Sequence, residues 1–189
     1  MLVLELKWEV ISMDFITGLL MTWRQHDSIM VVVDKLTKET HFILVKSTHK
    51  NDDIAKIFMK EIFKLHGFPK AIVFDEDVKF TSNFWKGLFA DLGINMNFST
   101  AYHPHIVGQI ERVNQVLEDM NHMYVLEKPT KWEYYLHLVE FSYNNGHQAS
   151  LGMSPYEALY GRRCRTPVTW DNPVNMVVPG PKLLKEMEQ

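Results

Sequence analysis

The order in which strand-like and helix-like patterns follow one another along the chain limits its fold more than any other feature. Three short apolar, β-rich bursts come first: WEVISMDFI at 8–16, SIMVVVDK at 28–35 and HFILVKS at 41–47. Short runs of such residues between turn formers are typical of β-strands. We therefore predict three sequential strands that pair as antiparallel neighbours.

Helical spacing begins after the third strand. Apolar residues from Ile54 to Leu65 recur at helical intervals, Asn51 is a candidate N-cap, and Gly67 supplies a stop. A strand, AIVF at 71–74, follows at once. Beyond it the sequence predicts a helix over 81–93, a strand over 94–99 and a long amphipathic helix over 110–124.

Two more helix starts are predicted from capping boxes. Thr130 and Glu133 form one such pattern, for a helix that runs through Tyr143. Ser154 and Glu157 form the other, with proline at the first helical position. The complete order predicts an α/β fold, in which a mixed five-stranded sheet is flanked by helices.

Composition supports one compact domain and narrows its setting. With 189 residues, 46% of them hydrophobic, the chain can bury a single core. Its one cysteine, Cys164, excludes an internal disulfide and favours an intracellular setting. We find no signal peptide and no membrane span. A formal net charge of −3 argues against nucleic-acid binding by bulk electrostatics, so DNA contacts would have to be local.

Three carboxylates occupy positions suited to a shared site. Alternation along the first strand puts Asp14 on the face of Val10 and Ser12, where an acid interrupts a largely apolar strand. Asp75 follows the strand AIVF, and Glu111 opens the long helix after thirty-five intervening residues. Carboxylates without a cysteine or histidine set suit Mg²⁺ or Mn²⁺, and two such ions support phosphoryl transfer.

Each carboxylate also has a purely structural interpretation. An aspartate at a strand end commonly forms a turn, and a glutamate in the first turn of a helix interacts favourably with the helix dipole. From pattern alone, these structural roles are favoured over a metal site.

A resemblance to a known family changes that balance. The segments WEVISMDFITGL, HDSIMVVVDKLTKETHF, FTSNFW, FSTAYHP, GQIERVNQVLEDM, EFSYNN and SPYEALYGRRCRTP closely resemble integrases of gypsy-type long-terminal-repeat retrotransposons. The resemblance spans the chain from Trp8 to about Trp170. It implies the ribonuclease H-like core of retroviral-type integrases, with a catalytic core domain over 1–166 and a proline-rich tail over 167–189 that leads to an absent C-terminal domain.

The resemblance also implies an activity and its ligands. Asp14, Asp75 and Glu111 match the family's two aspartates and glutamate, of which Asp14 would bridge two Mg²⁺ ions and the others would each complete one site. The implied reactions are cleavage near the 3′ ends of element DNA and joining of those ends to target DNA. The enzyme would then be a polynucleotidyl transferase and endonuclease that acts in the nucleus as a homo-oligomer on DNA.

Residues beside Glu111 are candidates for DNA contacts. Gln109, Arg112 and Asn114 carry side chains that hydrogen-bond phosphates or bases, although a solvated helix face would have the same composition. His103 and His105 lack the partners of a zinc set and are assigned to the loop. Arginines around Cys164 are candidates for a DNA or partner contact, or are simply solvated.

The chain departs from the family pattern in two loops. Relatives carry SDRGPQF around the second aspartate, whereas this chain reads FDEDVKF at 74–80 and so places Glu76 and Asp77 beside Asp75. The family's HPQTDGQSER is HPHIVGQIER at 103–112. We expect these changes to impair activity. Two alternatives follow: a catalytically silent remnant that serves as an interaction module, or another ribonuclease H-like nuclease, which GQIER and SPYEALYGRR disfavour.

Overall fold

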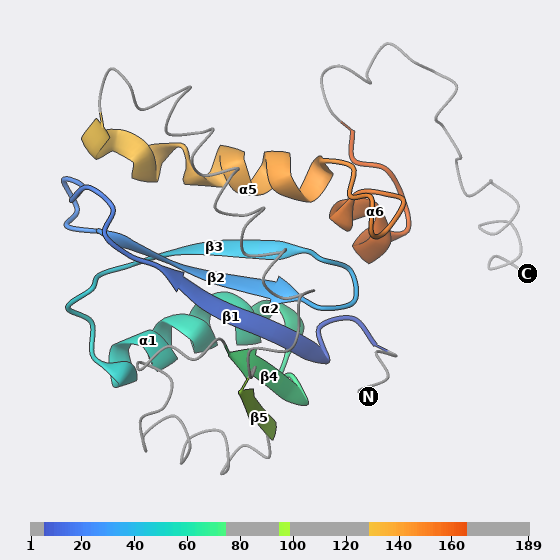
Figure 1. The fold of residues 1–189 in the computed structure, drawn as a ribbon, viewed down its shortest axis with the longest axis horizontal. Helices are drawn as coiled ribbons and strands as arrows, with labels where there is room; N and C mark the ends of the chain where they lie inside the picture. Colours follow the sequence, from blue (N-terminus) through green and yellow to red (C-terminus); the bar gives the residue numbers. More distant parts are fainter. Residues whose placement is uncertain (1–5, 75–94, 99–128, 166–189) are drawn as a thin grey trace, which may run out of the picture.

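A five-stranded mixed sheet forms the centre of the chain (Figure 1). The computed structural model describes residues 6–74, 95–98 and 129–165. The strand order is β3-β2-β1-β4-β5, with β1 antiparallel to β2, β2 antiparallel to β3, and both β4 and β5 running parallel to their neighbours. The strands are β1 Val10–Ile16, β2 Ser28–Asp34, β3 Thr40–Val45, β4 Ala71–Phe74 and β5 Asn95–Phe98. The predicted strands and their antiparallel start are confirmed.

One face of the sheet packs against the first helical segment. Side chains that alternate along β1, β2 and β3 meet the apolar face of that segment in one buried cluster, which includes Ile11, Met13, Met30, Val32, Ile43, Ile54, Phe58 and Ile62. Alternation explains this face, because every second residue of a strand points the same way. In Figure 1 the segment lies beside the sheet, across from α5.

The first helical segment is continuous but not uniform. It consists of α1 (Asn51–Phe58), a π-helical stretch η1 (Met59–Phe63) and the short α2 (Lys64–His66). The N-cap is Lys50, one residue before the predicted Asn51, and its backbone N–H donates to Asp53 Oδ2 at 3.3 Å. Gly67, at φ 79°, ends the segment as predicted, since a residue with a Cβ adopts this conformation only at a cost.

The other face packs against helices from the C-terminal part of the chain. A 3₁₀ helix, η3 (Pro129–Tyr134), leads into α5 (Leu136–Asn145). Trp132, Leu136, Val139 and Tyr143 join Ile29, Val31, Val33 and Phe42 in a second buried cluster. These two clusters make the sheet the middle layer of the described structure.

The predicted capping box at Thr130 is wrong. The α-helix begins at Leu136, and the Glu133 side chain turns inward instead of capping. Glu133 Oε2 accepts a hydrogen bond from Thr22 Oγ1 at 2.8 Å and lies 2.8 Å from His26 Nδ1. Partners in the β1–β2 connection therefore outcompete the local cap, because a buried carboxylate is costly unless it is paired.

Polar side chains of α5 cover the outer edge of β3. Asn144 Oδ1 accepts the Thr40 N–H at 2.9 Å, and its Nδ2 donates to the Thr40 carbonyl at 2.8 Å. Glu140 Oε2 accepts the Phe42 N–H at 2.8 Å. An edge strand presents unpaired backbone groups, and here α5 satisfies three of them.

The last described helix, α6 (Pro155–Tyr160), begins as predicted. The Ser154 side chain accepts the Glu157 N–H at 3.1 Å, and Pro155 occupies the first turn. The predicted helices over 81–93 and 110–124 and the tail over 167–189 lie outside the described residues. In the described ranges no helix is long and apolar enough to cross a membrane.

Candidate active site and a histidine cluster at the sheet edge

Asp14 lies on β1 with its side chain half-buried, on the face predicted for it. Its strand neighbours Ile11 and Met13 belong to the cluster under α1, whereas Val10 packs with Ala71 and Val73 on the opposite face. Asp14 Oδ1 accepts the backbone N–H of Phe15 at 2.8 Å. The carboxylate thus projects from the sheet face that does not carry α1.

The pairing of β1 with β4 defines the surroundings of Asp14. These strands run parallel, and Met13 is in register with Phe74, the last residue of β4. Asp14 and Asp75 each follow one member of this pair in the sequence. Asp75 and Glu111 lie outside the described residues, as do Gln109, Arg112 and Asn114, so their convergence with Asp14 stays a prediction.

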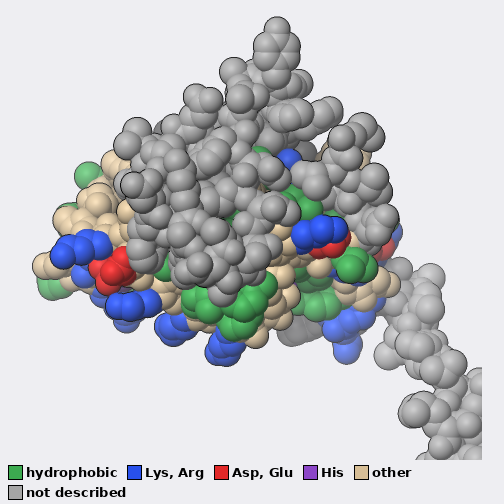
Figure 2. Space-filling view, turned by 90° about the horizontal axis from the view of Figure 1, so that it is seen from below, with side chains coloured by type: hydrophobic (Ala, Val, Ile, Leu, Met, Phe, Trp, Pro, Cys, Tyr) green, Lys and Arg blue, Asp and Glu red, His purple; other side chains and the backbone are tan. Residues whose placement is uncertain are grey.

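The arginines around Cys164 follow α6 and make contacts with that helix. Arg163 Nε lies 3.6 Å from Glu157 Oε1, and the Arg162 guanidinium lies 6.0 Å from the centre of the Tyr156 ring. Both arginines are exposed. Elsewhere, Figure 2 shows the Lys and Arg side chains of the described residues spread along one face between hydrophobic groups, without forming a single basic patch there.

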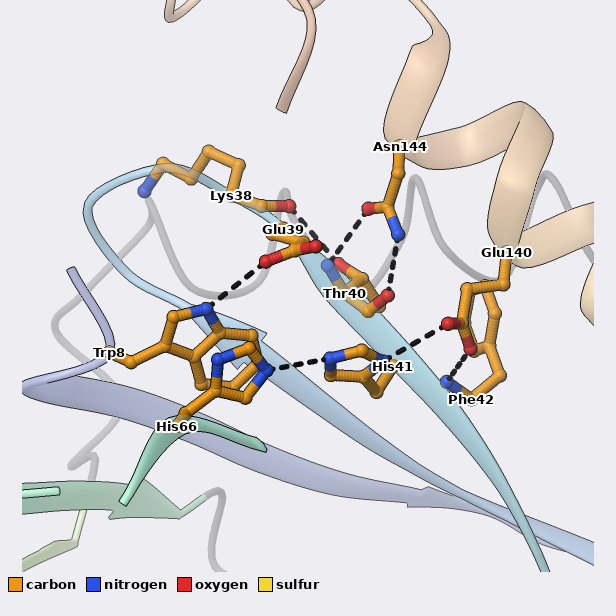
Figure 3. Close-up of polar contacts among 9 residues, drawn as sticks. All are labelled: Trp8, Lys38, Glu39, Thr40, His41, Phe42, His66, Glu140 and Asn144. Carbon is orange, nitrogen blue, oxygen red and sulfur yellow. Dashed lines mark hydrogen bonds and ion pairs between the residues drawn. The ribbon is translucent and has the colours of Figure 1, made fainter. Parts of the chain in front are cut away.

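A second polar cluster, which sequence reasoning missed, lies where β3 begins (Figure 3). It consists of Glu39, His41 and His66, each of which offers one potential metal-ligating atom, and these atoms all lie within 4.8 Å of one another. His41 Nε2 and His66 Nε2 are 3.0 Å apart. Glu39 is buried and the two histidines are half-buried.

Two further side chains fix the members of this histidine cluster. The Trp8 ring stacks on the His66 ring with centroids 3.7 Å apart and planes 6° from parallel, and Trp8 Nε1 donates to Glu39 Oε2 at 3.1 Å. Glu140 Oε1 lies 3.0 Å from His41 Nδ1. The residues come from the segment just before β1, the beginning of the edge strand β3 and the turn before it, the end of α2 and the helix α5 (Figure 3).

Burial alters the acidity of two members of the cluster. It raises the pKa of the Glu39 carboxyl, while the hydrogen bond from Trp8 acts in the opposite direction. Burial, with a smaller contribution from His41, lowers the pKa of His66 to about 4. The His66 imidazole is therefore neutral at neutral pH, and one of its ring nitrogens carries a lone pair.

One local signal for the cluster was present in the sequence. Glu39 and His41 stand two positions apart at the start of a predicted strand, so they project to the same side. His66 lies 25 residues beyond His41, and Glu140 lies 99 residues beyond it. Only the packing of α2 and α5 against β3 brings these side chains together.

The sequence is related to retrotransposon polyproteins. The Tf2-3 and Tf2-4 transposon polyproteins of Schizosaccharomyces pombe are each 33% identical to the chain over 156 residues. The match covers 82% of the chain and 12% of each polyprotein, so the chain spans a small part of the length of these relatives. No family model matches the chain.

The fold is that of retroviral integrase cores. The HTLV-2 integrase catalytic core domain, solved in complex with magnesium, superposes with a TM-score of 0.61 at 15% identity, over 81% of this chain and 97% of that one. The catalytic core domain of BIV integrase gives a TM-score of 0.59 at 21% identity, over 79% and 92%. A simian T-cell lymphotropic virus intasome, solved with a PP2A regulatory subunit, gives 0.66 at 16% identity, over 85% and 57%.

The order of strands agrees with these likenesses. The ribonuclease H-like fold expected from the sequence is confirmed. The chain is a homologue of a segment of the Tf2 retrotransposon polyproteins, and it has the fold of the retroviral integrase catalytic cores.

Proposed function

We propose that the chain performs integrase-type DNA strand transfer, with Asp14, Asp75 and Glu111 as the ligands of two divalent cations. The observation that carries this proposal is the parallel register of β1 and β4, in which Met13 is opposite Phe74. This register brings the residue before Asp14 and the residue before Asp75 side by side. The homology to retrotransposon polyproteins makes a shared function of the two aspartates a reasonable proposal.

The register has a geometric consequence for the two aspartates. Neighbouring strands lie about 4.8 Å apart, and consecutive Cα atoms are about 3.8 Å apart. If Asp75 continues the register of β4 by one residue, it stands opposite Asp14 and its side chain projects from the same face. Two carboxylates so placed would repel each other without a cation, which favours a metal between them.

The donor set fits Mg²⁺, with Mn²⁺ as a substitute, because all three proposed ligands are carboxylates. The HTLV-2 core with the same fold was solved with magnesium. When bound, two such ions activate the attacking oxygen and stabilise the leaving oxygen of a phosphodiester. The role of this chain's own residues is to hold the carboxylates in place, and the β1–β4 pairing fixes Asp14 for that purpose.

DNA is the proposed substrate, both as element ends and as target. Gln109, Arg112 and Asn114 would contact it, in a homo-oligomer assembled on the DNA in the nucleus. The fold likeness to chains of an intasome supports this assembly. Because the formal net charge is −3, we expect the isolated chain to bind DNA weakly and with a shallow salt dependence.

A strand-transfer assay tests the proposal. The chain is incubated with preprocessed oligonucleotides that carry the element's end sequence, together with target DNA, in Mg²⁺ and in Mn²⁺. We expect joined products that disappear in Asp75→Asn and in Glu111→Gln. Product formation that survives both substitutions would show that these residues are not the metal ligands.

A specific observation favours a second function. Glu76 and Asp77 follow Asp75, where relatives carry Arg and Gly, and close like charges oppose both joint ionisation and the approach of a phosphate. A catalytically silent remnant would keep the fold and serve as a nucleic-acid or protein interaction module. No joined product in either metal, together with retained DNA binding, would favour this function.

A further inference from the structure

We propose that Glu39, His41 and His66 form a binding site for a borderline divalent cation such as Zn²⁺, distinct from the proposed carboxylate site at Asp14. His41 shares its face of β3 with Ile43 and Val45, which belong to the cluster under α1. Asp14 projects from the opposite face of the sheet. The two sites therefore lie on different sides of one sheet and can be tested independently.

The spacing of the two histidine nitrogens is close to that of a tetrahedral site. All three lie within 4.8 Å of one another, and the two Nε2 atoms are 3.0 Å apart. Zinc–nitrogen bonds of about 2.0–2.1 Å place two tetrahedral ligands roughly 3.3 Å apart. A shift of a few tenths of an ångström would bring the two imidazoles to that spacing, and the Glu39 carboxylate lies within 4.8 Å of both.

Side chains that hold the three ligands in place, as in known metal sites with histidine ligands, surround the histidine cluster. His41 Nδ1 lies 3.0 Å from the carboxylate of Glu140, and a metal-ligating histidine commonly donates its other ring N–H to such a group. That hydrogen bond leaves the lone pair of His41 on Nε2, which faces His66. Trp8 holds the other two ligands, by stacking on His66 and by its hydrogen bond to Glu39.

The chemistry of these ligands selects the class of cation. Two imidazoles and one carboxylate form a mixed nitrogen and oxygen set, which suits Zn²⁺ rather than Mg²⁺. Two neutral imidazoles and one carboxylate leave a single positive charge on the complex, and Glu140 lies next to it. Three protein ligands leave a fourth position for water or an external ligand.

Without a cation the same contact is a hydrogen bond between two imidazoles. One Nε2 must then carry a proton and donate it to the other. Metal binding replaces that proton with the ion, and the His66 proton moves to Nδ1. The metal-free and metal-bound states therefore differ in the tautomer of His66 and in metal content, and both differences can be measured.

A bound ion would join parts of the chain that are distant in sequence. Trp8 precedes β1, Glu39 and His41 stand at the start of the edge strand β3, and His66 ends α2. An ion held by all three ligands requires the folded state, so it stabilises that state by mass action. We expect saturating Zn²⁺ to raise the melting temperature by on the order of 5 °C.

The test is a titration of the complete 189-residue chain with Zn²⁺, followed by calorimetry and thermal unfolding. The titration uses an Asp14→Asn background, so that failure of the carboxylate site cannot affect the result. We compare this protein with His66→Gln and with the matched control His137→Gln, which removes an exposed histidine of α5. Co²⁺ replaces Zn²⁺ in a parallel experiment that reads ligand type by visible absorption.

We expect one equivalent of Zn²⁺ to bind, the affinity to fall about 10-fold or more in His66→Gln, and the control to bind as before. No binding, or equal binding by His66→Gln, would overturn the proposal. If His66→Gln does not fold, ¹⁵N shifts of the histidine rings decide the matter in the parent chain. Zn²⁺ must then move the Nε2 signals of His41 and His66, and movement confined to other histidines refutes the site.

Discussion

Two aspartates on neighbouring strands have opposite surroundings. Asp34, the last residue of β2, is fully buried, and its carboxylate accepts hydrogen bonds from Trp8 N, Leu36 N, Thr37 N and Thr37 Oγ1 at 3.0, 3.4, 3.0 and 2.6 Å. Asp14, on β1, is half-buried and accepts from the N–H of the next residue. Both acids interrupt apolar strands, but Trp8, Leu36 and Thr37 surround the Asp34 carboxylate with hydrogen-bond donors.

Asp34 is a structural carboxylate. Asp34 accepts hydrogen bonds from the turn between β2 and β3 and from the backbone N–H of Trp8, a residue with a φ of 61°. Trp8 in turn stacks on His66, so Asp34 acts on the histidine cluster through it. We propose that the half-buried Asp14 carboxylate interacts with cations. The first three predictions test this contrast directly, and the fourth tests the two residues that follow Asp75 in the sequence.

The largest effect is expected from Asp14→Asn, on activity alone. Loss of a bridging anion weakens both metal sites, so strand transfer should fall by about 10³-fold or more, because metal stabilisation of the reaction is worth several kcal/mol. Denaturant unfolding should change little, since the amide can still accept the Phe15 N–H. Asp52→Asn, at an exposed position of α1, is the matched control. Equal activity of Asp14→Asn and the parent would exclude the site.

Asp34→Asn should have the next largest effect, and this effect should be on the stability of the fold. The substitution turns an NH₂ group toward donors of Trp8, Leu36 or Thr37 and leaves some of them buried and unsatisfied. We expect the free energy of unfolding to fall by about 3 kcal/mol. Urea denaturation of the variant and the parent measures the difference. An unchanged midpoint would mean that the Asp34 network contributes nothing to stability.

A smaller loss is expected from Thr37→Val, which keeps the shape of the side chain but removes a hydroxyl that donates to Asp34 and accepts the Glu39 N–H at 3.3 Å. Thr37 is buried, and its hydroxyl donates to Asp34 Oδ2 at 2.6 Å. A hydrogen bond to a charged group contributes about 1.5–3 kcal/mol, and the remaining donors to Asp34 should keep the loss near the lower end. Thermal unfolding compares it with Thr37→Ser, which retains the hydroxyl. If both variants lose the same stability, the hydroxyl has no role.

The smallest effect concerns the loop that follows Asp75, outside the described residues. The double change Glu76→Arg, Asp77→Gly introduces the residues that the resembling integrases carry there and removes charges that repel phosphate, each pair about 4 Å apart being worth about 1 kcal/mol in water. We expect strand transfer or DNA affinity to rise several-fold. Fluorescence anisotropy and the joining assay measure the two quantities. No gain in either, in a chain that is already active, would show that the loop is harmless.

Sequence patterns predicted much of the sheet because its information is local. Alternation along β1 assigned Asp14 to the face opposite Ile11 and Met13, and packing confirmed it. The Ser154 cap was likewise predicted, because its hydroxyl oxygen and the Glu157 N–H that donates to it lie three residues apart. Of the proposed site, the sequence supplied residue types and spacing, and the β1–β4 register supports one part of it.

Tertiary structure determined the hydrogen-bond partners of those side chains that contact residues far away in the sequence. Glu133 matches a local capping pattern, yet it binds Thr22 and His26, 111 and 107 residues away, because burial makes pairing obligatory. His41 and His66 meet only when α2 packs against the sheet, and Glu140 reaches His41 only because α5 covers the edge of β3. Sequence alone therefore determined the strands, the Gly67 and Ser154 helix ends and the relationship to retrotransposon polyproteins, whereas long-range packing determined which polar groups face each other.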